Sequence, residues 1–242
     1  MADCEVWVSV TSRRVIKLLK KKKNEEYKNL PQTLADIDML GYKHVSVVSI
    51  NIFPTDEHEV LKKIVDGFKH FSLANISCTN ALLTKTKETT AFLKDLNEQI
   101  SKDDTANLYV IHGTPRLDTV GIDSISYSAS FLELISENNF TCSLEGAFPY
   151  FEINDVIKSR IEKLGLKKVQ VVPLLLVSGN HYIEDMFEIK DDLSDKFESF
   201  IVPSLTKSEK FNLIELPMIQ NIIEKNIQNT FKMMGISHKE IT

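Results

Sequence analysis

Three polar residues combine the side-chain types that bind divalent transition metals. His112 follows LYVI, Glu145 follows FTCSL, and His181 follows VVPLLLVSGN. Two neutral imidazoles and one carboxylate form a recognised ligand set for such an ion. Three protein ligands also leave a coordination position open for water or a substrate. These residue types are therefore compatible with a metal site that can still accept another molecule.

The spacing of these residues excludes a local metal motif such as HExxH, because they lie 33 and 36 residues apart. They could converge on one ion if their strands are neighbours in a parallel sheet. Adjacent strands there lie about 4.8 Å apart, and ligands bind beyond the carboxyl ends. Gly113 and Gly179 stand beside the histidines and allow a close backbone approach. The alternative is an ordinary strand-to-helix turn, with each histidine a structural or surface group.

The elements that must position these residues alternate between strands and helices. Apolar, β-branched runs predict strands at residues 6–10, 45–50, 73–78, 108–111, 140–144, 169–177 and 200–202. Amphipathic spacing predicts helices at residues 13–22, 33–40, 54–68, 88–100, 122–137, 153–164 and 217–234. This alternation predicts an α/β fold with parallel sheets flanked by helices.

We expect two similar lobes, because both halves of the chain repeat the same strand–helix rhythm. Apolar residues become sparse around residues 101–107, which favours a domain boundary there. The predicted domains are an N-terminal α/β lobe at 1–104 and a C-terminal α/β lobe with the metal ligands at 105–216. A terminal helix at 217–242 is expected to pack back on the first lobe.

The composition is that of an ordinary globular protein and narrows the function classes. The 242 residues include 34 acidic and 29 basic side chains, a net charge of −5, and 43% are hydrophobic. Because phosphate neutralisation needs clustered Lys and Arg, we expect no nucleic-acid partner. Three scattered cysteines without a CxxC pair predict neither a disulfide framework nor a cysteine zinc site. No segment predicts a membrane span or a signal peptide, so the expected location is the cytoplasm.

Several segments resemble one family of enzymes. They are VIHGT, SLEGAFPYFEI and VVPLLLVSGNHYIEDM, together with TSRRVIKLLK, GYKHVSVVSINIFPTDEHE and LIELP. In this order they resemble the anaerobic cobaltochelatases of the CbiK type. That family consists of class II tetrapyrrole chelatases, which insert cobalt into sirohydrochlorin during cobalamin synthesis. The resemblance spans almost the whole chain, and its most specific part is the segment that contains His181.

The resemblance implies roles for four residues. His112 stands at the histidine of the family's GHG motif, which is a metal ligand and the candidate base. Glu145 stands at the glutamate of the VE-x-YP motif and His181 at the histidine of the AGDH motif, and both are metal ligands. Glu57, in PTDEHE, matches an acidic residue of the substrate cleft. Without the resemblance, Glu57 is typical of a solvated acid in the first turn of a helix.

The chain departs from the family pattern at specific places. The family fold implies two similar α/β lobes with the macrocycle between them, but the first β-α unit has no counterpart here and is expected to be missing. Pro115 and Arg116 follow HGT, where the family often has two further histidines. The segment GAFP at residues 146–149 carries one residue more than the YP motif, and Asn180 replaces the usual Asp.

Metal insertion requires that the pyrrole N–H protons leave and that the ion sheds its waters. A neutral histidine, with an ordinary pKa of about 6.5, is suited to accept protons near neutral pH. We therefore expect His112 and His181 to be catalytic, with His112 as the first proton acceptor and Glu57 as a relay. Because one nitrogen cannot bind metal and proton together, ligand exchange is expected during insertion.

The carboxylates of the macrocycle predict basic residues around it, because an arginine fork can bind both carboxylate oxygens. The predicted substrate-binding residues are Arg13, Arg116 and His58, with Arg14 and His44 as further candidates. For the arginines, the alternative is a surface role in solubility.

The predicted function is a sirohydrochlorin cobaltochelatase that inserts Co²⁺ into sirohydrochlorin or precorrin-2. Co²⁺ is the substrate metal, no organic cofactor is expected, and the partners are the tetrapyrrole and the metal, without a membrane. An oligomer is compatible with the sequence. Two alternatives stay open: a non-catalytic metal or tetrapyrrole binder, and a chelatase for Fe²⁺ or Ni²⁺, because this ligand set accepts those ions too.

Overall fold

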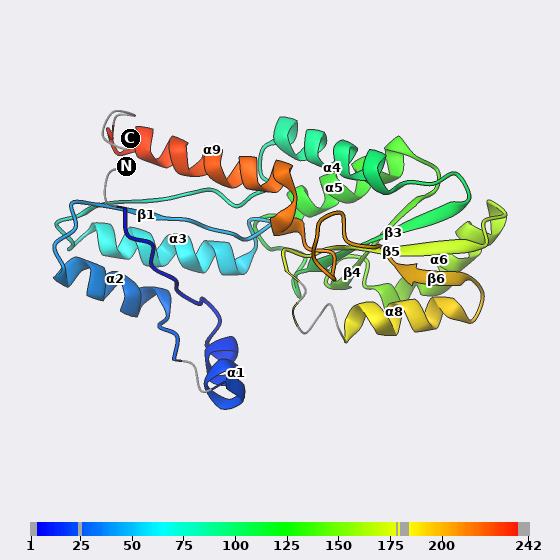
Figure 1. Ribbon diagram of the computed structural model, residues 1–242, viewed down its shortest axis with the longest axis horizontal. Coiled ribbons are helices and arrows are strands. Elements are labelled where there is room, and N and C mark those ends of the chain that lie inside the picture. Colours follow the sequence, from blue (N-terminus) through cyan, green and yellow to red (C-terminus); the bar gives the residue numbers. More distant parts are fainter. Residues whose placement is uncertain (1–3, 24–25, 178, 180–183, 237–242) are drawn as a thin grey trace. The chain divides into compact units, whose positions relative to one another are not determined.

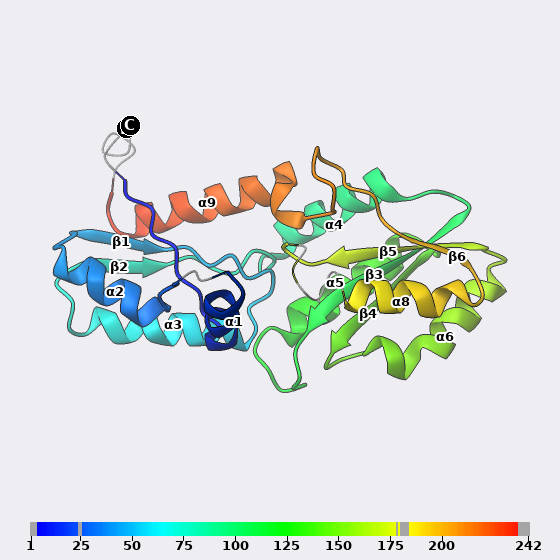
Figure 2. The same ribbon diagram turned by 60° about the horizontal axis from the view of Figure 1, so that its bottom comes forward.

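Two compact α/β units make up the protein. The computed structural model describes residues 4–23, 26–177, 179 and 184–236. Unit 1 comprises Met1–Ser49, Asp56–Ala81 and Ile223–Thr242. Unit 2 comprises Ile50–Thr55 and Leu82–Ile222. In each unit, parallel strands are covered by helices (Figures 1 and 2).

The secondary structure alternates as the sequence predicts. The helices are α1 (Arg13–Lys23), α2 (Leu30–Met39), α3 (Asp56–Lys69), α4 (Thr86–Ile100), α5 (Ile122–Ile135), α6 (Tyr150–Lys163), α8 (Asp185–Ser194), the 3-10 helix η1 (Leu213–Glu215) and α9 (Pro217–Met233). The strands are β1 (His44–Val47), β2 (Asn75–Cys78), β3 (Thr105–Gly113), β4 (Asn139–Glu145), β5 (Lys168–Leu174) and β6 (Glu198–Ile201).

The core of unit 1 forms where two short parallel strands meet amphipathic helices. β1 and β2 pair from His44 opposite Asn75 to Val47 opposite Cys78. In both views, α2 and α3 lie on one side of these strands and the unit 1 part of α9 on the other (Figures 1 and 2). The buried core residues are Leu30, Leu34, Ile37, Val45, Val47, Leu61, Val65 and Ile76. In α2 and α3 they recur every three or four residues, which places them on one helix face.

α2 begins three residues before its predicted start, because a capping box closes its amino end. The Gln32 backbone N–H donates to the Asn29 side chain at 3.0 Å, and the Asn29 N–H donates to the Gln32 side chain at 3.1 Å. This reciprocal pair satisfies backbone donors that the first helical turn leaves free. Pro31 lies in that same first turn, where its missing N–H is not needed.

Unit 2 is built on a four-stranded parallel sheet in the order β4-β3-β5-β6. β3 is the strand that carries His112, and every residue from 105 to 111 in it is buried. It pairs with β4 from Asn107 opposite Asn139 to Gly113 opposite Glu145. Its other edge pairs with β5, where Ile111 lies opposite Leu174. The carboxyl ends of β4, β3 and β5 are therefore adjacent.

Helices cover both faces of this sheet, α4 and α5 on one and α6 and α8 on the other (Figure 1). Among the described helices, α8 and the short 3-10 helix η1 were not predicted from the sequence. In α8, the buried residues Met186, Ile189 and Leu193 have helical spacing, and Asp185 and Glu188 lie in its first turn. Both features favour a helix, so the sequence did contain the signal.

The predicted α/β fold class is confirmed, and one predicted strand is wrong. Residues 4–10 form no strand, and Val6 and Val8 are largely exposed. A strand exists only with a neighbour, and the Val10 N–H at the end of this stretch donates to the Lys28 carbonyl at 3.1 Å. The apolar pattern was therefore not enough to form a strand there.

The predicted domains at 1–104, 105–216 and 217–242 stay a prediction, and the two compact units are not the same ranges. Leu82–Ile100 belongs to unit 2, and α9 contributes residues to both units. Among the described helices, none combines the length and the apolar character that crossing a membrane requires. The described cysteines, Cys4, Cys78 and Cys142, are free thiols.

A buried amide network joins three strands of unit 2 near their amino ends. Asn107 on β3 donates to Asn139 on β4 at 2.7 Å and accepts from Gln170 on β5. Asn139 also donates to the Asn97 side chain and to the Leu132 carbonyl, each at 2.8 Å. These side chains on the strands are at most 1% exposed. Because buried polar groups need partners, the network defines the register of the strands.

We expect Asn107→Leu to lower the free energy of unfolding of unit 2 by about 2–4 kcal/mol, because it removes the Asn107 donor of the buried Asn139 side-chain oxygen and one of the two acceptors of the buried Gln170 amide, which also donates to the Ile100 carbonyl at 2.9 Å. Urea unfolding followed by circular dichroism measures this loss. Gln99→Leu is the control: its amide donates to Asp95 on the surface of α4 at 2.7 Å, so its effect should stay within about 0.5 kcal/mol. Equal losses in the two variants would contradict the structural role of the network.

Candidate metal site

The structure brings two of the three predicted metal ligands together. His112 and Glu145 lie at the carboxyl ends of the neighbouring strands β3 and β4, with His112 Nδ1 3.6 Å from Glu145 Oε1. Their side chains are 46% and 45% exposed. The strand before His112 is fully buried. The buried strand β3 therefore positions the imidazole at a solvent-accessible edge of the sheet.

Two glycines allow this close approach. Gly113 and Gly146 have φ angles of +80° and +81°, which L side chains rarely adopt. A Cβ atom on Gly113 would lie 1.9 Å from the Glu145 carbonyl oxygen, and one on Gly146 would lie 1.7 Å from the Thr114 carbonyl oxygen. The backbones after β3 and β4 are thus in reciprocal contact. Gly113 behaves as the sequence predicted, and the role of Gly146 was missed.

The separation of the two side chains suits one metal ion between them. Ligand bonds of about 2.1 Å at a tetrahedral angle place the two ligand atoms about 3.4 Å apart, close to the observed 3.6 Å. His112 Nδ1 also lies 3.4 Å from the Gly113 carbonyl oxygen. Metal binding through Nδ1 requires the tautomer with its proton on Nε2. His112 and Glu145 can therefore hold a metal ion between Nδ1 and Oε1. In the other tautomer, Nδ1 carries a proton in place of the ion.

The third predicted ligand, His181, lies outside the described residues. The strand that precedes it, β5, is the other neighbour of β3, so the sheet order has the adjacency that the metal hypothesis requires. Within residues 4–177, 179 and 184–236, apart from 24–25, no group of three or more His, Cys, Asp and Glu side chains is placed to hold a metal ion. The three-residue site stays a prediction.

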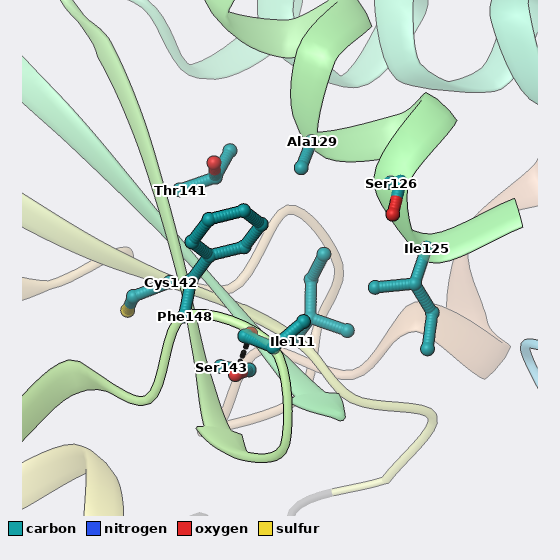
Figure 3. Close-up of a pocket in the computed structure, with 9 residues that line it drawn as sticks. Ile111, Ile125, Ser126, Ala129, Thr141, Cys142, Ser143 and Phe148 are labelled. Carbon is teal, nitrogen blue, oxygen red and sulfur yellow. Dashed lines mark hydrogen bonds between the residues drawn. The ribbon is translucent and has the colours of Figure 1, made fainter. Parts of the chain in front are cut away.

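The loop after Glu145 folds back on its own strand. The Ser143 N–H donates to the Phe148 carbonyl at 2.9 Å, and the Ser143 hydroxyl donates to the Ala147 carbonyl. Figure 3 shows the Phe148 ring beside Thr141 and Ile111, at a shallow apolar crevice that α5 closes on its other side. The sequence shows the additional residue in the segment GAFP at residues 146–149, but it does not predict the backbone conformation of this loop.

Of the two predicted substrate-binding arginines, the structure describes the side chain of Arg116 and not that of Arg13. Arg116 binds its neighbour Asp118 in bidentate fashion, with Nε to Oδ1 at 2.9 Å and Nη2 to Oδ2 at 2.7 Å, and both side chains are largely exposed. The hydrogen bonds and charge of Arg116 hold the pKa of Asp118 below its ordinary value. Arg13 begins α1, and its side chain lies outside the described part. Substrate binding by either arginine stays a prediction.

The predicted relay and the predicted binding histidine lie in unit 1. Glu57 is exposed in the first turn of α3. His58, the next residue, is only 3% exposed, and its Nδ1 lies 2.9 Å from the Ser49 hydroxyl. The Ser49 N–H in turn donates to the Thr79 hydroxyl at 2.8 Å. His58 is therefore part of a buried polar contact, and its predicted contact with substrate stays untested.

Solved structures share this fold. SirB from Bacillus subtilis with Fe³⁺ matches with a TM-score of 0.60 and 13% identity over 92% of each chain. The sirohydrochlorin chelatase SirB from Bacillus subtilis subspecies spizizenii, in complex with cobalt, matches with a TM-score of 0.55 and 13% identity over 86% of this chain and 78% of that one. DR2241 from Deinococcus radiodurans, a multi-domain protein with structural similarity to chelatases, matches with a TM-score of 0.53 and 14% identity over 88% and 50%.

The fold is therefore the α/β fold of the chelatases, with metal-binding residue types at the carboxyl edge of one sheet. A family model described as cobalt chelatase (CbiK) matches residues 1–232. The chain belongs to the cobalt chelatase (CbiK) family, and its class is that of the metal chelatases.

We expect Gly146→Ala to lower the free energy of unfolding by about 3 kcal/mol or more, because its Cβ would collide with the Thr114 backbone. Gly165→Ala is the matched control. Gly165 has a similar φ of +73°, but no atom lies within 4 Å of its added Cβ, so about 1 kcal/mol is expected. Urea unfolding measures both values. Similar losses of unfolding free energy in the two variants would mean that the positive φ angle, and not the contact with Thr114, explains the requirement for glycine at position 146.

The buried His58 predicts a pH dependence of stability. Burial, followed by the charge of Lys62, lowers the pKa of His58 below its ordinary 6.5, while Glu59 acts in the opposite direction. The unfolded chain then binds more protons than the folded chain, so this contribution is present above pH 6.5 and is lost as the pH falls below it. His58→Gln should flatten the loss of stability between about pH 7.5 and about pH 5.5.

The measurement is the urea midpoint at both pH values in wild type and variant. His70→Gln, which changes an exposed histidine just after α3, is the control and should keep the wild-type slope. If both variants keep that slope, His58 does not control the pH dependence.

Proposed function

We propose that the chain inserts Co²⁺ into sirohydrochlorin, as a cobaltochelatase of the anaerobic route to cobalamin. Membership of the cobalt chelatase family supports this proposal. The observation that carries it is the 3.6 Å separation of His112 Nδ1 and Glu145 Oε1 at the carboxyl edge of the unit 2 sheet. An imidazole and a carboxylate at this separation form half of a metal coordination shell and leave the other half for water or substrate nitrogens.

The two exposed side chains would first take the ion from water. Each ligand replaces a bound water, so the ion reaches the macrocycle partly dehydrated. The negative charge of Glu145 attracts the cation, and the coordination positions that the pair leaves open allow the ring nitrogens to bind it. The ring would approach from the solvent side, because both side chains are nearly half exposed at the edge of the sheet.

His112 would next act as the proton acceptor. Once the ring nitrogens bind the ion, the bond to Nδ1 breaks, and the freed imidazole can take a pyrrole proton. Glu145 lies close enough to stabilise the resulting imidazolium, since the same atoms are 3.6 Å apart. In this proposal His181 is the third ligand and Glu57 passes the proton on to water.

We expect His112→Ala and Glu145→Gln each to lower the rate of Co²⁺ insertion by about 100-fold or more, because each removes a ligand and the proton-accepting pair. The change in absorbance of sirohydrochlorin during incubation with Co²⁺ measures the rate. His70→Ala, an exposed histidine of unit 1, is the control and should keep the wild-type rate. His181→Ala should fail like His112→Ala.

Turnover number separates the proposal from its alternatives. A chelatase converts many equivalents of tetrapyrrole per chain, whereas a binding protein changes the spectrum by at most one equivalent. The same assay with Fe²⁺ and Ni²⁺ ranks the metals, and precorrin-2 replaces sirohydrochlorin in a parallel series. Wild-type rates in both histidine variants would contradict the assigned site.

A further inference from the structure

Phe148 has a backbone conformation that is unfavourable for its residue type. Among the described residues it is the only non-glycine residue with a positive φ, at +63°. A bulky side chain is rarely found there, because its Cβ crowds the neighbouring backbone. Such strain persists only when the surrounding structure imposes it, and it gathers at functional sites.

The neighbouring contacts impose this conformation. Ser143 holds the loop from one side, with its N–H on the Phe148 carbonyl at 2.9 Å and its hydroxyl on the Ala147 carbonyl. Pro149 forms a parallel bridge with Ser143, and Tyr150 then begins the buried start of α6. The loop therefore has little freedom to relax the strain.

Phe148 is also more exposed than its ring would favour. Its relative exposure is 58%, although phenylalanine is usually buried. The crevice beside it, which Ile111, Ile125 and Ala129 line, takes up only part of the ring (Figure 3). Strain and exposure therefore coincide in one residue: the loop contacts impose the strained backbone, and packing within the chain leaves more than half of Phe148 exposed.

The position of Phe148 relates it to the metal-binding pair. It follows Glu145 by three residues, and its loop bridges to Ser143, which pairs with Ile111, the residue before His112. The start of the loop touches the chain just after β3, because a Cβ atom on Gly146 would lie 1.7 Å from the carbonyl oxygen of Thr114, two residues after His112. A half-exposed aromatic ring on this loop can touch the rim of a large planar ligand whose centre is at the metal.

We propose that Phe148 is a substrate-contacting residue that packs against the tetrapyrrole beside the metal site. This inference rests on the proposed function. A conjugated macrocycle and a phenyl ring gain apolar burial and favourable offset or edge contacts. The rigid loop presents the ring without a loss of conformational freedom on binding, which favours affinity. The residue thus contributes to binding of the organic substrate and not to binding of the metal.

Phe148→Gly separates this role from a packing role. Glycine accepts a φ of +63° without strain, so the variant should melt at the wild-type temperature or above it. The loss of the ring contact should raise KM for sirohydrochlorin about 2- to 10-fold, with KM for Co²⁺ unchanged within about twofold. Phe148→Tyr keeps the ring and should retain the wild-type KM. Leu134→Ala removes another exposed apolar side chain, near the far end of α5, and is the control.

The measurements are melting temperature, KM for each substrate, and a fluorescence titration of sirohydrochlorin without metal. A lower melting temperature with unchanged KM would overturn the inference, because the ring would then only fill the crevice. A rise in both KM values would overturn it as well, since the loop would then shape the metal site. If wild type neither binds nor converts sirohydrochlorin, the proposed function fails and this inference with it. A fully active wild type with an unaffected Phe148→Gly variant overturns this inference alone.

Discussion

The reciprocal backbone contact after β3 and β4 is the constraint on which the site depends. Gly113 lies against the Glu145 carbonyl and Gly146 against the Thr114 carbonyl, with no room for a Cβ atom on either. Parallel pairing alone places strand ends about 4.8 Å apart and leaves the direction of the following residues open. The glycine contacts remove that freedom. They bring an imidazole and a carboxylate that are 33 residues apart in the chain to within 3.6 Å.

The two ends of the unit 2 sheet have different physical roles. At the amino ends, the amides of Asn107, Asn139 and Gln170 are buried and paired, which favours one register and a stable core. At the carboxyl ends, His112 and Glu145 are nearly half exposed, and Phe148 is strained. A protein can maintain unfavourable local features only where the rest of the fold is stable enough. The network at one end thus supports the exposed and strained groups at the other.

Much of the site was predictable because strand ends leave a signal in the sequence. His112 follows the run LYVI and Glu145 follows FTCSL, both predicted as strands, and parallel topology places such residues at one edge. Burial was less predictable: His58 lies within a helix pattern whose inner face depends on its packing, and it contacts Ser49 instead of lying exposed. The strand expected at residues 6–10 failed for a similar reason, because a strand requires a neighbour that the pattern does not reveal.

The sequence by itself determined the α/β class, the periodicity of the helices and the residue types that follow the buried strands, because hydrophobic spacing and local capping depend on near neighbours in the chain. Only the tertiary structure decided the strand order β4-β3-β5-β6, the meeting of His112 with Glu145, and the strained backbone of Phe148. These features depend on contacts between residues remote in the chain. Such contacts form only when the strands of the sheet pack together.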